Sequence, residues 1–127
     1  MPFDLTVHRE KSIIEVLYPP EPTASDVEDY GTRVRKIIDE LPGPWASLVD
    51  QRQLVAMPTE LLRSIAQLNS YAEGHRMQRS ARVVSDPAAG MSSWRIARQG
   101  SVRVPIRSFD TREEALQWLE ESAASAL

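Results

Sequence analysis

The chain has 127 residues, 42% of them hydrophobic and 26% charged, which is the composition of one ordinary globular domain. It contains no cysteine, so disulfides, thiolate catalysis and cysteine-based metal sites are excluded, and its formal net charge of -3 argues against a surface that is basic throughout. No apolar run approaches the roughly 20 residues of a membrane span, and the first residues lack a signal-peptide core, so we expect a single cytoplasmic domain over residues 1–127.

Two apolar segments open the chain and predict an antiparallel hairpin. Residues 3–8 alternate apolar and polar side chains, as a half-buried strand does. A charged turn separates them from residues 13–18, which are rich in branched and aromatic side chains and are ended by the proline pair 19–20. We therefore expect the first two strands to pair with each other.

A helix and a buried strand are predicted next. Residues 25–41 repeat apolar side chains at spacings of three and four, and Ser25 with Glu28 has the pattern of a capping box at the start. The short apolar segment 45–49 predicts a central strand buried on both faces, and Asp50 ends it.

Helices and strands continue to alternate in the second half of the chain. The predicted elements are a helix from Pro58 to Gly74, a strand at 81–84, a short helix within 87–99, a strand at 102–109, and a helix from Asp110 whose tail at 122–127 frays. The order ββαβαβαβα predicts a single α/β domain with a mixed five-stranded sheet, about four helices and right-handed crossovers.

Three segments carry a resemblance to a known family. They are the buried strand with its acidic end, WASLVD at 45–50, the strand ARVVSD at 81–86 before Trp94, and the ending in which VPIRSF at 104–109 runs into EEALQWL at 113–119. In order and spacing they make the chain similar to the SpoIIAA-like branch of the STAS superfamily, small domains related to bacterial anti-sigma-factor antagonists. The resemblance covers about residues 1–120, and it implies a mixed sheet with packed helices and a non-catalytic regulatory domain that binds a protein partner.

The resemblance also points to Thr59 as a phosphorylation candidate. In the antagonists, the loop after the buried strand carries a phosphorylatable serine at a helix N-terminus, in a run like Asp-Ser-Ser-Gly. The corresponding stretch here, 57–61 (MPTEL), has Thr59 as its one hydroxyl and no glycine, so the phosphoswitch is expected to be degenerate or absent. The alternative is that Thr59 is an N-cap or first-turn threonine whose side chain accepts a backbone amide of the following helix.

Further candidates for binding a partner or ligand lie in two places. Asp50 ends a strand, the usual position of ligands in open α/β sheets, although it can equally accept amides from the next loop; Met57 lies in that loop. Residues 75–109 hold seven arginines and one acid, a basic segment within an acidic chain. The candidates of this segment are Ser92, Ser93, Trp94, Arg95 and Arg98.

Binding of a protein partner, or self-association, is the function that these observations favour. The alternative is a small apolar, lipid-like ligand in a pocket between sheet and helices near Tyr71, Trp94 and Trp118. The arginines lie on several elements without interleaved aromatic residues, so we expect no nucleic acid partner. Two distant histidines and five isolated glycines predict neither a metal site nor a cofactor. No nucleophile–base motif is present, so an enzyme would require strand-end carboxylates such as Asp50 and Asp86 to converge.

Overall fold

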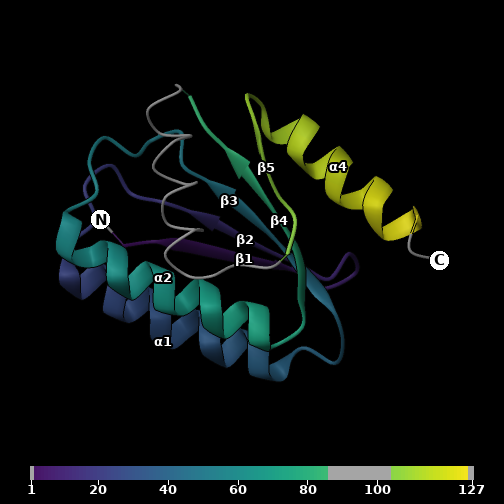
Figure 1. Ribbon diagram of the computed structural model, residues 1–127, viewed down its shortest axis with the longest axis horizontal. Coiled ribbons are helices and arrows are strands. Elements are labelled where there is room, and N and C mark those ends of the chain that lie inside the picture. The colour runs from purple at the N-terminus through teal and green to yellow at the C-terminus, as the bar shows by residue number, and fades with distance from the viewer. Residues whose placement is uncertain (1, 86–103, 126–127) are drawn as a thin grey trace.

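A mixed five-stranded sheet lies at the centre of the computed structural model, which describes residues 2–85 and 104–125 (Figure 1). The elements are β1 (Asp4–His8), β2 (Ile13–Leu17), α1 (Ala24–Glu40), β3 (Trp45–Asp50), α2 (Thr59–Gly74), β4 (Met77–Val83), β5 (Ile106–Phe109) and α4 (Arg112–Ser125). The strands follow one another in the order β1-β2-β3-β4-β5. β1 pairs antiparallel with β2 and all later neighbours are parallel, so the predicted fold class is confirmed. The short helix predicted within residues 87–99 lies outside the described residues.

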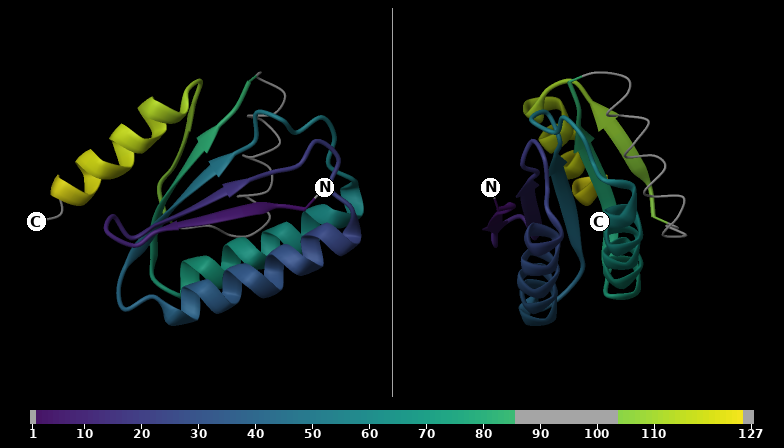
Figure 2. Two further views of the ribbon diagram at one scale, coloured as in Figure 1. Left: turned by 180° about the vertical axis from the view of Figure 1, so that it is seen from behind. Right: turned by 90° about the vertical axis from the view of Figure 1, so that its left-hand side faces the viewer.

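Helices cover both faces of the sheet. α1 and α2 lie side by side on one face, and α4 crosses the other face (Figure 2). Each face has its own apolar cluster. The larger one packs β1, β2 and β3 against α1 and α2, and the smaller one packs Leu48 and Val83 against Ala115 and Leu119 of α4. β3 is therefore central and buried on both faces, as its apolar sequence predicts.

The capping box of α1 lies two residues before the predicted one. Thr23, not Ser25, is the N-cap: its hydroxyl accepts the amide of Asp26 at 3.1 Å, and the Asp26 carboxylate accepts the amide of Thr23 at 3.0 Å. The backbone at Thr23 is still extended (φ -99°, ψ 168°), so the helix has already begun when the chain reaches Ser25. The prediction of a capping box formed by Ser25 and Glu28 was therefore wrong. The observed pair, Thr23 and Asp26, has the same spacing of three residues.

Two strand boundaries also differ from their predicted positions. β4 begins at Met77 rather than at residue 81, because buried Met77 joins the larger cluster and a register shift opposite Trp45 and Ala46 accommodates the polar residues that follow. Within the described residues β5 begins at Ile106 rather than at 102. Pro105 precedes it, accepts the amide of Ser80 through its carbonyl, and has no amide of its own to donate.

Candidate functional site

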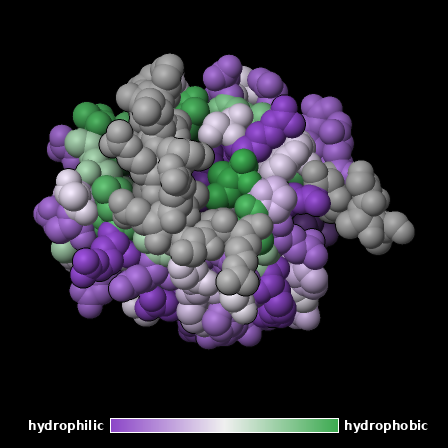
Figure 3. Space-filling view, viewed as in Figure 1, coloured by the Kyte–Doolittle hydropathy of each residue, from purple (hydrophilic) through white to green (hydrophobic). Residues whose placement is uncertain are grey.

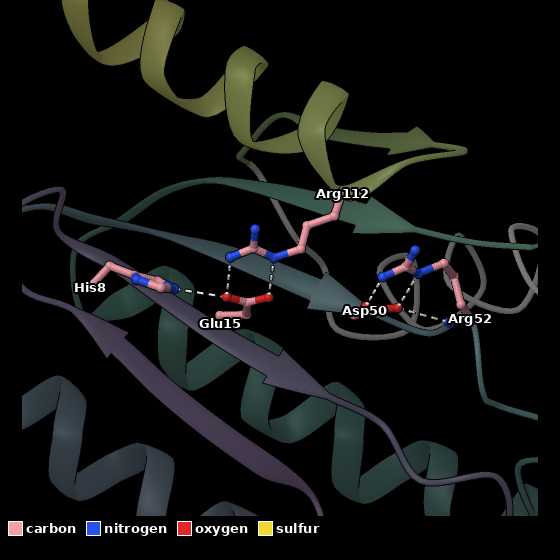
Figure 4. Close-up of polar contacts among 5 residues, drawn as sticks. All are labelled: His8, Glu15, Asp50, Arg52 and Arg112. Carbon is pink, nitrogen blue, oxygen red and sulfur yellow. Dashed lines mark hydrogen bonds and ion pairs between the residues drawn. The ribbon is translucent and has the colours of Figure 1, made fainter.

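The end of β3 is occupied by an ion pair within the chain. Asp50 is 6% exposed, and its carboxylate accepts three hydrogen bonds from Arg52: from the backbone amide at 3.1 Å, from Nε at 3.0 Å and from Nη2 at 2.7 Å (Figure 4). This bidentate geometry is the strong form of an arginine–carboxylate contact. The hydrogen bond to Asp50 raises the pKa of Arg52. Asp50 therefore holds the loop that leaves the sheet, as the alternative interpretation of this residue describes.

A second ion pair joins the same face of the sheet to α4. Glu15 of β2 accepts hydrogen bonds from Nε and Nη2 of Arg112 at 2.7 and 2.8 Å, and its Oε1 lies 2.8 Å from Nε2 of His8 (Figure 4). The Arg112 guanidinium is the main cause that lowers the pKa of Glu15 to about 2. A carboxylate held this strongly in its ionised form is a poor general base at neutral pH. Glu15 thus connects β1, β2 and α4.

The loop between β3 and α2 presents the largest exposed apolar side chain of the described residues. Val55 is 75% exposed, whereas Leu54 and Met57 on either side are half-buried against the larger cluster. The amides of Val55 and Ala56 both donate to the carbonyl of Pro20, at 2.8 and 3.3 Å. The loop is therefore anchored by side chains and by backbone, and it holds Val55 in solvent.

Thr59 is the first residue of α2 and is exposed. The N-cap is Pro58, and no side chain makes a capping hydrogen bond. Thr59 is therefore not the N-cap, and it lies in the first turn of the helix, the other position that the alternative allows. Its hydroxyl stands at a helix N-terminus whose first amides lack a side-chain acceptor.

The arginines of residues 75–109 are dispersed where the structure describes them. Arg76 donates to the carbonyls of Ile38, in the last turn of α1, and of Leu41, its C-cap, and Arg82 is buried in the molecule. Arg79 lies over the Trp118 ring and Arg107 over the Phe109 ring. The remaining site predictions of this segment, on Ser92, Ser93, Trp94, Arg95 and Arg98, lie outside the described residues.

The pocket expected near Tyr71, Trp94 and Trp118 is not formed by its two described members. Tyr71 packs at the edge of the cluster under α1 and α2, where its hydroxyl donates to Asp39 at 2.6 Å, whereas Trp118 packs against Phe109 on the opposite face of the sheet. The sheet lies between them, so they cannot line one cavity. That placement was wrong because sequence periodicity does not tell which face a helix covers.

Sequence reasoning did not find Glu15, Arg52, Arg112 and Val55. One signal was present, a glutamate in the middle of the apolar strand Ile13–Leu17, which predicts a charged partner on the covered face. Among residues 2–85 and 104–125, no group of three His, Asp or Glu side chains could hold a metal ion. In the same part of the chain, no helix is both long and apolar enough to cross a membrane.

Comparison with known proteins identifies the class of fold. No family model matches the chain, and no curated protein matches it. Its structure is similar to the crystal structure of an uncharacterized protein from the DUF3478 family with a SpoIIAA-like fold, from Shewanella loihica PV-4. The TM-score is 0.76 at 13% identity, over 93% of this chain and 94% of that chain. This likeness shows the fold, and the SpoIIAA-like architecture implied by the sequence is confirmed.

Proposed function

We propose that this chain is a non-catalytic, STAS-like interaction domain that binds a protein partner through the loop of residues 51–59. The observation that carries the proposal is the exposure of Val55 on an anchored loop. Val55 is 75% exposed on a segment that two backbone hydrogen bonds to the carbonyl of Pro20 hold in place, so ordering it on binding costs little entropy. As part of the same proposal, we place the protein in the cytoplasm, as the sequence leads us to expect.

The surroundings of Val55 fit an interface better than an active site. Figure 3 shows one face of the molecule, on which hydrophilic residues predominate along the lower and right-hand edges and hydrophobic residues lie nearer the centre and on the left. The half-exposed guanidinium of Arg52 lies in the same loop and Thr59 follows it, so an apolar contact is flanked by polar groups, as in the centre and rim of protein interfaces. The carboxylates of Asp50 and Glu15 are held by arginines, which supports a role without catalysis.

Site-specific photo-cross-linking tests the proposal. A photoreactive amino acid replaces Val55 in one variant and Glu10 in a matched control, since Glu10 is exposed in the β1–β2 turn, at the opposite ends of the strands. In cells of the source organism we expect a discrete adduct at position 55 and none at position 10. The mass of the adduct distinguishes a different protein from a second copy of this chain. Equal labelling at both positions, or none at 55, would contradict the proposal.

A further inference from the structure

Arg82 is a buried cation whose charge no described acidic side chain balances. It lies on β4, is 2% exposed, and faces α1 and α2 in register with Val49. The ion pairs of the described residues do not include it. The partly buried carboxylate of Glu15 is bound by Arg112, and the buried carboxylate of Asp50 is bound by Arg52. Arginine keeps its proton in proteins, so the charge remains in the interior and calls for a negative partner.

Two hydrogen-bond donors meet at one cavity beside this arginine. Nε of Arg82 and Nδ2 of Asn69 are buried and have no acceptor among the described residues. Both residues line the same cavity between the sheet and α1 and α2. The hydroxyl of Ser47, which also lines it, is already bonded to Ser80 at 2.6 Å. A ligand that satisfies this set has to accept hydrogen bonds.

The nearby phenols do not supply the missing negative charge. Tyr18 is fully buried and shares a side-chain hydrogen bond with Arg82, and Tyr30 lines the cavity. Burial raises the pKa of both groups, and the Arg82 charge only partly offsets this effect. Both tyrosines therefore stay neutral at physiological pH.

The size of the cavity limits the ligand to a single small ion. Its volume is about 30 Å³, more than the roughly 10–15 Å³ that one water molecule needs and far below the several hundred Å³ of a typical small-molecule pocket. The other lining residues are mostly apolar, such as Ile14, Val34 and Leu68, and a low-dielectric wall strengthens attraction between an anion and a guanidinium. A water molecule fits but leaves the charge of Arg82 unbalanced. We propose that this cavity binds a monatomic halide, chloride in the cell, held by Arg82 and Asn69.

The dependence of stability on chloride tests this site. Urea unfolding is followed while chloride replaces gluconate at constant ionic strength. Because only the folded state has the site, the unfolding constant falls about tenfold for each tenfold rise in chloride above the dissociation constant. The Arg82→Met variant is expected to lose this dependence. Arg107→Met, which removes an exposed arginine on β5, is the matched control and is expected to keep it.

A second variant and a direct observation cover the case in which Arg82→Met does not fold. Asn69→Asp places a carboxylate at the wall of the same cavity, so we expect it to raise stability at low chloride and to abolish the response. In crystals grown with bromide, anomalous scattering is expected beside Nε of Arg82. A wild type equally stable in both salts, an Asn69→Asp variant that still responds fully, or only water at the site would each overturn the proposal. None of these results depends on the loop of residues 51–59.

Discussion

Glu15 concentrates much of the electrostatic stabilisation of the α4 face in one carboxylate. Its folded pKa of about 2 lies below the ordinary value of 4.5, so its contribution is complete above about pH 4.5 and is lost as the pH falls toward 2. The side chain is 17% exposed, and the contribution at neutral pH is roughly 2–3 kcal/mol. We expect Glu15→Gln to be less stable than wild type by that order at pH 7, and the difference to shrink steadily below pH 4.5.

Urea unfolding at pH 7, 4 and 3 measures this dependence. Asp29→Asn is the matched control, since Asp29 forms an exposed pair with Arg33 one turn along α1 and such pairs contribute little. A Glu15→Gln deficit that stays constant across this range would show that Glu15 stabilises the fold by packing and not by its charge.

Arg76 combines a strained backbone with two useful hydrogen bonds. It has a φ of 76°, in the left-handed region, while its guanidinium donates to Leu41 at 2.8 Å and to Ile38 at 3.0 Å. Both Arg76→Ala and Arg76→Gly lose these bonds, so both are expected to be less stable than wild type. Glycine relieves the backbone strain, which costs about 1–2 kcal/mol at a non-glycine residue. This gain is larger than the entropic cost of introducing glycine.

We therefore expect Arg76→Gly to be more stable than Arg76→Ala by up to about 1 kcal/mol. This order reverses the one usual in regular structure, where alanine is the better residue. Urea midpoints of the two variants give the comparison directly. An alanine variant that is the more stable of the two would show that the turn relaxes when the arginine is removed.

At the scale of the element, the N-terminus of α2 is open to added negative charge. No side chain caps this helix, and Thr59 is exposed at its first position. We expect Thr59→Glu to raise the free energy of unfolding by about 0.3–1 kcal/mol through the helix dipole, with the gain screened by salt. Thr59→Ala is the matched control and should change stability by less than about 0.5 kcal/mol.

The two Thr59 variants also test whether the Thr59 hydroxyl accepts a backbone amide in the first turn of α2. Loss of a capping hydroxyl would cost about 1 kcal/mol in Thr59→Ala. A loss of that size would mean that the hydroxyl caps α2 in solution. If alanine is neutral and glutamate stabilises, the position tolerates a phosphate without refolding.

The periodic elements of this fold are predictable because their patterns are local. The apolar spacing of α1 and the alternation in β1 are complete within a few turns or residues. The start of β4 at Met77 was not predicted, because polar Gln78 and Arg79 follow it. The strand begins there because Met77 pairs with β3. The position of the capping box was not predicted, because Thr23 and Ser25 both carry a hydroxyl that can cap a helix. The extended backbone at Thr23 makes that residue the N-cap.

The residues of the candidate site are likewise predictable only where a local pattern indicates them. Asp50 and Thr59 are placed by the ends of their own elements, so the sequence indicates them. Glu15 and Arg112 lie 97 positions apart, and Arg82 is an arginine in a strand whose neighbours across the core come from two helices. No local pattern carries such pairings. They depend on the order of the strands and on which face each helix covers.

At the scale of the whole molecule, a parallel sheet needs helices on both faces, and α4 alone covers one of them among the described residues. Beneath it lie Ile13, Leu48, Ala81 and Val83, all buried and all apolar. We expect a chain that ends at Asp110 to expose this surface, to bind an apolar dye and to sediment as oligomers. Shortening the chain only after Glu121 keeps Ala115 and Leu119 in place and is the matched control, expected to remain as wild type. A monomeric 1–110 chain with an unchanged urea midpoint would contradict this expectation. The side chains under α4 would then supply none of the roughly 1.5–3 kcal/mol that a fully buried large apolar side chain ordinarily contributes.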